Sequence, residues 1–170
     1  TPCGTLFPYT TLFRSKIMVD YPDAEEELEI MKQVTGTMEQ RLEPIIGGEE
    51  IMRLQHVVRR VPVAEHVFEY ARALVRASRP GEEEAPDFVE ELVEWGAGPR
   101  ASIFLILTAK ARAVLHGRYH ATTEDVRALA PAVLRHRVIT TFNAEAAGLR
   151  SDDVVERLLE VVPEQAEQIV

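Results

Sequence analysis

Residues 96–115 read GAGPRASIFLILTAKARAVL, and they decide the fold of this chain. Gly96, Gly98 and Pro99 force a turn. Pro99 suits the first position of a helix, because the N–H that proline lacks would have no helical partner there. From Pro99 to about His116 few side chains are polar, and a helix that is apolar nearly all round is typical of the centre of a core. We therefore expect a turn that opens directly into a central helix.

Three more helices are expected before this turn. The first follows Asp23, a good N-cap, and ends at Gly36, with a buried stripe of Leu28, Met31 and Val34. The second covers residues 49–60, with one inward face formed by Ile51, Leu54, Val57 and Val58. The third covers about 64–78, with an inward face of Val67, Tyr70, Ala71, Leu74 and Val75.

The segment between the third helix and the turn is polar and then ambiguous. Residues 79–86 form a loop whose acidic run, 82–84, we interpret as solvated. The basic residues around it, Arg72, Arg76 and Arg79, are likewise interpreted as a solvated helix face. Residues 87–95 fit either a short helix or an irregular segment.

Further helices follow the central one, which Gly117 ends. Thr122 or Thr123 caps the next helix, because acidic residues fill its first turn. Pro131 is expected to interrupt that helix, since it lacks an N–H, and a short piece continues to residue 137. Ser151 is expected to cap a last helix over 152–162.

The N-terminal part differs from the rest. Residues 16–20, KIMVD, predict a strand that Pro22 stops. A single strand needs a partner, so we expect a sheet on its N-terminal side. Residues 1–15, TPCGTLFPYTTLFRS, lack periodicity, and PYTTLFRS resembles a translated sequencing-adapter remnant. We hypothesise that residues 1–15 are non-native; a native disordered or strand-forming N-terminus is the alternative.

The sequence thus predicts an all-α fold of six or seven helices after one orphan strand. Its expected divisions are a non-native segment at 1–15, the orphan strand at 16–22, a helical region at 23–163 and a tail at 164–170.

Composition narrows the function. The 170 residues carry 19 Lys and Arg against 28 Asp and Glu, a formal charge of -9, which argues against a nucleic-acid-binding surface. Cys3 is the only cysteine, so no internal disulfide is expected and a cytoplasmic location fits. No apolar run is long enough to span a membrane.

His116 and His120 are four residues apart, but Gly117 breaks the helix between them, so no metal site is expected. The chain also lacks a GxxxxGK[ST] phosphate loop.

Two motifs resemble the MoxR family of AAA+ ATPases. Residues 96–102, GAGPRAS, resemble the family's sensor-2 motif, which usually reads Gly-Ala-Ser-Pro-Arg-Ala. Residues 123–137, which begin TEDV and end LAPAVLRHR, resemble its next signature, and residues 19–30 resemble the exit from its ATPase core. The resemblance covers about residues 16–163 and implies the C-terminal lid of such an ATPase. It also implies that residues 16–22 are the last strand of an α/β core that is otherwise missing. The phosphate loop, magnesium-binding acidic strand, sensor 1 and arginine finger would then lie before residue 16.

The resemblance also implies a function. Members use ATP with magnesium, assemble into rings, usually hexamers, and remodel client proteins as chaperones do, often with a protein that carries a von Willebrand factor A domain. Arg100 matches the sensor-2 arginine, and its guanidinium would contact a nucleotide phosphate. Gly98 and Pro99 would aim it, although Gly98 replaces the usual serine. The alternative for Arg100 is a local ion pair with Glu91 or Glu94.

The sequence is compatible with three functions. The first is a lid that binds no nucleotide tightly and is inactive alone. The second is a stand-alone helical interaction module, against which the orphan strand argues. The third is a helical nucleic-acid-binding domain, suggested by residues 122–137 with their basic end and opposed by the net acidity.

Overall fold

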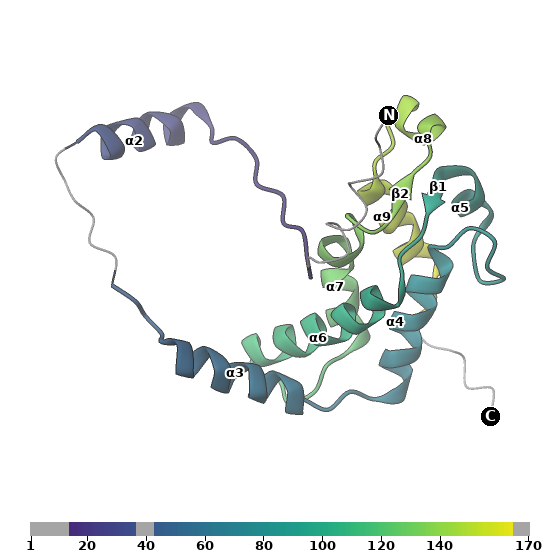
Figure 1. Ribbon diagram of the computed structural model, residues 1–170, viewed down its shortest axis with the longest axis horizontal. Coiled ribbons are helices and arrows are strands. Elements are labelled where there is room, and N and C mark those ends of the chain that lie inside the picture. Colours follow the sequence, from purple (N-terminus) through teal and green to yellow (C-terminus); the bar gives the residue numbers. More distant parts are fainter. Residues whose placement is uncertain (1–13, 37–42, 165–170) are drawn as a thin grey trace, which may run out of the picture.

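The computed structural model describes residues 14–36 and 43–164. The predicted non-native segment at 1–15 and the predicted tail at 164–170 therefore lie almost entirely outside the described residues. Within them the fold is helical, with one small two-stranded sheet, as the sequence predicts for an all-α protein (Figure 1).

Four helices make the core. They are α4 (Glu65–Ala77), α6 (Pro99–Leu115), α7 (Thr123–Leu134) and α9 (Ser151–Val161). Helix α6 contacts α3, α4 and α7. Its buried stripe repeats every four residues, the spacing that keeps side chains on one helix face, and consists of Ala101, Leu105, Ala109 and Ala113. Small alanine side chains let neighbouring helices approach closely, so α6 has the central place that its composition predicts. It is not buried all round, because Ile103 and Leu115 are exposed.

The inward face predicted for the third helix is confirmed. Val67, Tyr70, Ala71, Leu74 and Val75 of α4 are all buried. Their spacing of three and four residues matches the helical repeat, which is why the sequence pattern located them correctly.

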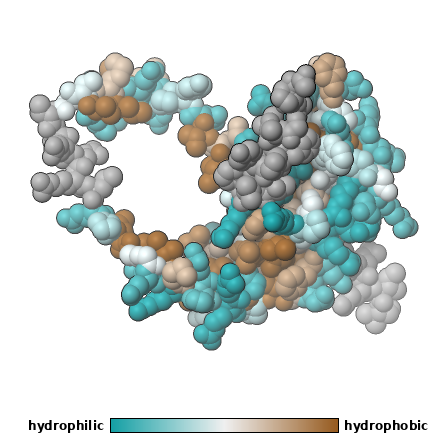
Figure 2. All heavy atoms as spheres, viewed as in Figure 1, coloured by the Kyte–Doolittle hydropathy of each residue, from teal (hydrophilic) through white to brown (hydrophobic). Residues whose placement is uncertain are grey.

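The inward faces predicted for the two preceding helices are wrong. Helices α2 (Ala24–Thr35) and α3 (Gly48–Arg60) form where expected, and Asp23 caps α2, but neither helix contains a buried residue. Leu28 is 48% exposed and Val34 78% exposed. Helix α2 stands apart from the four core helices (Figure 1), and hydrophobic residues line the sides of α2 and α3 that face the open space between them (Figure 2). The periodicity correctly marks apolar faces, but α2 and α3 bury none of their residues, although α3 contacts α6.

The predicted strand at 16–20 is also not formed. Residues 15–23 have no regular secondary structure. The backbone N–H of Lys16 donates to the carbonyl of Ala132 in α7 at 2.7 Å instead of pairing with another strand. A strand is stabilised by a ladder of hydrogen bonds to a neighbour, and among the described residues no neighbouring strand is offered to this segment.

Two features in the second half of the chain were not predicted, a small sheet and a short helix. Strand β1 (Val93–Trp95) pairs antiparallel with β2 (Ile139–Thr140), so the ambiguous segment 87–95 becomes helix α5 (Asp87–Leu92) followed by β1. Helix α8 (Phe142–Ala146) follows β2, capped by Thr141, whose hydroxyl accepts from the Ala144 N–H. These elements are two to six residues long, too short for a periodic signal.

Pro131 does not interrupt its helix, contrary to expectation. Helix α7 runs through it to Leu134, and the Arg135 N–H still donates to the Pro131 carbonyl at 3.1 Å. A proline inside a helix removes one hydrogen bond and crowds the preceding turn. Here burial of Ala130, Val133 and Leu134 on either side holds the helix in the core.

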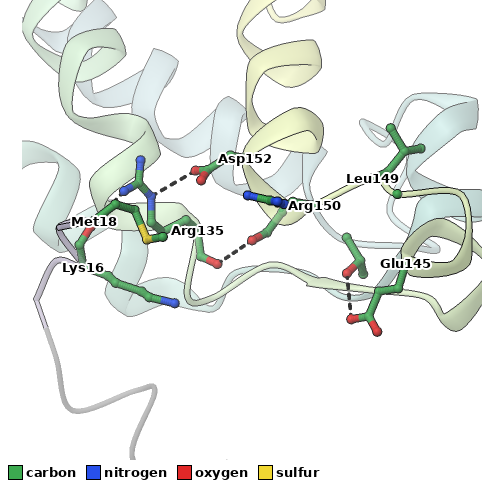
Figure 3. Close-up of a pocket in the computed structure, with 10 residues that line it drawn as sticks. Lys16, Met18, Arg135, Glu145, Leu149, Arg150 and Asp152 are labelled. Atoms are coloured by element: carbon green, nitrogen blue, oxygen red, sulfur yellow. Dashed lines mark hydrogen bonds and ion pairs between the residues drawn. The ribbon is translucent and has the colours of Figure 1, made fainter. Parts of the chain in front are cut away.

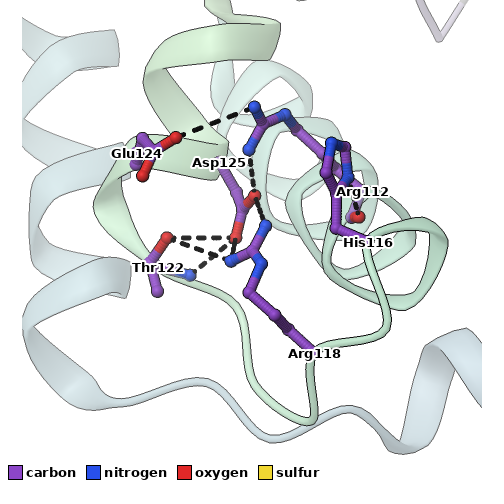
Figure 4. Close-up of polar contacts among 6 residues, drawn as sticks. All are labelled: Arg112, His116, Arg118, Thr122, Glu124 and Asp125. Carbon is purple, nitrogen blue, oxygen red and sulfur yellow. Dashed lines mark hydrogen bonds and ion pairs between the residues drawn. The ribbon is translucent and has the colours of Figure 1, made fainter.

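A buried carboxylate fixes the corner between α6 and α7 (Figure 4). Asp125 is fully buried and accepts from Arg112 Nη1 at 2.6 Å, from Arg118 Nη1 at 2.7 Å and from the Thr122 N–H at 3.0 Å. Thr122 is the N-cap of α7, one of the two threonines predicted for that role. Burial alone would raise the pKa of Asp125, but the hydrogen bonds from Arg118, Arg112 and Thr122 outweigh it and hold that pKa well below its usual range.

Candidate functional site

The three residues predicted to form a site lie together at the start of α6. Gly98 is the N-cap, with φ -80° and ψ 176°, Pro99 is the first helical residue, and Arg100 follows it. All three are exposed. The Ala101 N–H donates to the Gly98 carbonyl at 2.9 Å, which closes the first turn of the helix. Proline at this position has its φ already set for a helix, so the direction of α6 is fixed within one residue of Arg100.

The turn before Arg100 is held by the C-terminal end of α4. The Ala97 N–H donates to Ser78 Oγ at 3.0 Å, and the Ser78 hydroxyl donates to the Val75 carbonyl at 2.7 Å. The Ala97 carbonyl accepts from Arg79 Nε at 2.8 Å. Ser78 and Ala97 are fully buried. Both backbone polar groups of Ala97 are thus bonded to the residues directly after α4.

Gly96 is required by the close approach of these two segments. A Cβ atom at Gly96 would lie 2.3 Å from the Ser78 carbonyl oxygen and 2.6 Å from the Arg79 Cα. Those atoms are backbone, so they have little freedom to move aside. The sequence predicted a turn at Gly96 but gave no sign that the turn packs against a helix end 18 residues earlier.

The acidic loop after α4 is partly paired, not wholly solvated. Arg79 lies 3.5 Å from Glu82, and Arg76 contacts Glu82 at 2.6 Å and Glu84 at 2.7 Å. Arg76 and Arg79 are therefore partly exposed, as predicted, but they also form ion pairs that the sequence analysis did not predict. Glu83, between the two paired glutamates, is exposed.

The start of α6 is an open and electropositive place. Every other helix among the described residues has at least one acidic residue in its first turn, whereas α6 has none. The N-terminal N–H groups and the dipole of a helix attract anions, and acidic residues in the first turn normally satisfy part of that attraction. A Cβ at Gly98 would meet no atom within 4 Å. The start of α6 therefore has helical N–H groups, open space at Gly98 and an exposed arginine, features that suit an anion.

A concave region lies away from the start of α6. A cavity of about 450 Å³ is bordered by residues 16 and 18, the end of α7, β2 and the start of α9 (Figure 3). Its charged groups nearly balance, because Lys16, Arg135 and Arg150 face Glu145 and Asp152. Arg135 bonds to Asp152 at 2.9 Å, and Thr140 bonds to Glu145 at 3.2 Å. This cavity contains none of the predicted site residues, and its polar groups are largely bonded to one another.

Two further features are absent from residues 14–36 and 43–164. No helix there is both long and apolar enough to cross a membrane. In the same ranges, no three His, Cys, Asp or Glu side chains come together in a way that could hold a metal ion.

Comparison with known proteins places the chain within a family. The AAA lid domain family matches residues 87–158, which include the turn and α6 to α9. Chaperone MoxR1 of Mycobacterium tuberculosis is 33% identical over 150 residues, which is 88% of this chain and 40% of that protein. Protein MoxR of Methylorubrum extorquens is 35% identical over 113 residues, 65% of this chain and 33% of that protein.

A solved structure shares the fold. It is a crystal structure of a protein from Cytophaga hutchinsonii described as an ATPase, with a TM-score of 0.83 and 29% sequence identity, and the similarity covers 92% of this chain and 48% of that one. The chain therefore spans less than half the length of each of these three proteins. The lid match, the MoxR relatives and the shared fold agree with one another, and we conclude that this chain belongs to the MoxR family of AAA+ ATPases and carries the family's lid domain.

Proposed function

We propose that this chain supplies the nucleotide-sensing lid of an ATP-hydrolysing machine, and that Arg100 contacts a phosphate of the bound nucleotide. The observation that carries the proposal is the start of α6, where an exposed arginine stands at the one described helix whose first turn has no acidic residue. A guanidinium offers a fixed fork of donors to phosphate oxygens. The helix dipole adds to the same attraction.

Of the parts of ATP, only the phosphates suit the groups described at this site. The described residues supply an arginine and helical N–H groups, which suit an anion, and they supply no cluster of acidic side chains for magnesium. We therefore assign to this chain the sensing of the phosphate. Magnesium binding and the attack of water belong to other parts of the complete ATPase.

The family suggests what such sensing is for. One relative is named a chaperone, and we propose that this protein likewise remodels client proteins in the cytoplasm, as part of a ring of ATPase subunits, usually a hexamer, with a von Willebrand factor A domain protein as a possible partner. Closure of a lid on nucleotide, and its release after hydrolysis, is a common way to turn chemistry into movement.

A chimeric enzyme tests the role of Arg100. The matching 150 residues of MoxR1 are replaced by those of this chain, and ATP turnover is measured for the chimera and for its Arg100→Ala and Arg100→Lys variants. We expect kcat to fall about 100-fold in Arg100→Ala, the usual cost of removing one well-placed charge stabiliser. Arg100→Lys should lie between the two, because lysine keeps the charge but not the fork.

Matched variants make this test specific. Arg150 is an exposed arginine at the N-cap of α9, so Arg150→Ala removes a similar cation from a similar place and should leave turnover unchanged. A double change, Glu91→Gln with Glu94→Gln, tests the local-pair alternative for Arg100. Normal turnover in Arg100→Ala, or a loss in the glutamate variant equal to that in Arg100→Ala, would show that Arg100 is not a phosphate sensor.

A further inference from the structure

The turn that carries Arg100 has only one adjustable residue. Ala97 is buried, and both its N–H and its carbonyl are bonded to residues after α4. Pro99 has a ring-fixed φ. Between them lies Gly98, which has the widest backbone freedom of any residue. The direction in which Arg100 leaves the surface therefore depends on how firmly Ala97 is held.

Arg79 and Ser78 hold Ala97 from two sides. Ser78 Oγ accepts from the Ala97 N–H at 3.0 Å and is fixed by its own bond to Val75. Arg79 Nε donates to the Ala97 carbonyl at 2.8 Å, on the opposite polar group of the same residue. With only one of these bonds, Ala97 could still rotate about the bonded group.

Arg79 is itself held in place. Its guanidinium lies 3.5 Å from Glu82, which also bonds to Arg76 at 2.6 Å. A half-buried arginine that donates to a carbonyl and pairs with a carboxylate has few alternative positions. The contact with Glu82 links the acidic loop to the turn through one side chain.

We propose that Arg79 is a positioning residue for Arg100, acting with Ser78 to fix the turn at Ala97 and so the direction in which α6 begins. The proposal rests on the proposed sensor function of Arg100, and it extends the site to the end of α4, which lies outside residues 87–158. It also gives the paired part of the acidic loop a role, since Glu82 orients Arg79.

The first test uses the 170-residue chain itself. Backbone ¹⁵N relaxation reports the order of the Arg100 amide in the native chain, in Arg79→Gln and in the matched control Arg76→Gln. Arg76 lies three residues earlier and bonds to the same loop, but it does not touch the turn. We expect the order parameter of Arg100 to fall from about 0.85 to below about 0.6 in Arg79→Gln alone. An unchanged value in Arg79→Gln, or an equal fall in Arg76→Gln, would overturn the proposal.

The second test asks whether Arg79 acts through Arg100. In the MoxR1 chimera we expect Arg79→Gln to lower kcat by roughly fivefold to tenfold, the rate equivalent of losing about one net hydrogen bond. The double variant Arg79→Gln with Arg100→Ala should turn over at the rate of Arg100→Ala alone, because a residue that only positions Arg100 has no effect once Arg100 is absent. Multiplied losses would show that Arg79 has a separate structural role.

The two proposals fail in different ways. Full turnover in Arg100→Ala contradicts the sensor function itself. A strong loss in Arg100→Ala combined with full turnover in Arg79→Gln contradicts only the positioning role of Arg79, and leaves the sensor function standing.

Discussion

At the scale of single residues, Asp125 is the charge whose loss the fold tolerates least. It is fully buried and accepts from Arg112, Arg118 and Thr122. Asp125→Asn leaves two arginines without their anion, and breaking a buried pair usually costs about 3 kcal/mol or more. Urea unfolding at pH 7 should show that loss. Glu124→Gln is the matched control, because Glu124 lies 3.8 Å from Arg112 but is exposed, and its effect should stay below about 0.5 kcal/mol. Equal effects in the two variants would contradict this account.

The same carboxylate predicts a pH dependence. Its pKa is lower in the folded chain than in the unfolded one, so the unfolded state binds the proton more tightly. The stabilisation is fully present above the ordinary Asp pKa of about 3.9 and is lost as the pH falls below it. The difference in unfolding free energy between the native chain and Asp125→Asn should therefore be constant from pH 7 to about 5 and shrink below about pH 4. A difference that does not change with pH would show that Asp125 is not the titrating group.

Sequence reasoning found only part of the candidate site at this scale. Arg100, Pro99 and Gly98 are adjacent and belong to a recognisable motif, so they could be named in advance. Ser78 and Arg79 could not. They meet the turn across 18 and 19 residues, through polar groups that follow no hydrophobic period. Gly96 marked the turn, but nothing in the sequence indicated that its missing side chain allows the two backbones to touch.

At the scale of elements, the turn before α6 makes a prediction with an internal control. Gly96→Ala would put a Cβ 2.3 Å from a backbone oxygen, and overpacking of this kind typically costs about 1–3 kcal/mol. Gly98→Ser, two residues later, meets no atom within 4 Å and has an ordinary φ of -80°. A serine N-cap accepts from the first turn, so it should stabilise α6 by a few tenths of a kcal/mol. Thermal unfolding of both variants measures this. A similar loss in both would mean that the turn is not packed as described.

Long elements were predictable from the sequence and short ones were not. Helices α4, α6 and α7 each offer three or more turns of periodic side chains, and all three were located. Strands β1 and β2 contain three and two residues, and they form because residues 93–95 and 139–140 are brought together by α7 and the core around it. At Pro131 a strong local signal led to a wrong prediction. The proline predicts a helix interruption, but burial of the residues on either side of it keeps α7 helical.

At the scale of the whole molecule, the described residues comprise a packed body and two helices, α2 and α3, whose apolar faces are largely exposed. Val34 of α2 is 78% exposed, whereas Leu105 of α6 is fully buried. Val34→Lys should therefore change the unfolding free energy by less than about 0.5 kcal/mol. Leu105→Ala should cost about 3 kcal/mol, through lost burial and the cavity left behind. Urea unfolding measures both. A large loss in Val34→Lys would show that α2 packs against this chain's own core in solution.

The strand predicted at 16–20 and the apolar stripes of α2 and α3 mark the limit of prediction at this scale. Their sequence patterns correctly identify a short apolar run at 16–20 and one apolar face on each helix. Whether such a face is buried depends on what lies against it, and a pattern within one segment does not contain that information. The core around α4 and α6 was predictable because its partners are in the same chain.

We propose that the turn at residues 96–100 aims Arg100 at a nucleotide phosphate. A crystal structure of the MoxR1 chimera with a non-hydrolysable ATP analogue tests it most directly. We expect Arg100 nitrogens about 2.7–2.9 Å from a phosphate oxygen, the distance of a charge-assisted hydrogen bond, with the bonds from Ser78 and Arg79 to Ala97 unchanged. An Arg100 turned away from the bound nucleotide and paired with Glu91 or Glu94 would contradict it.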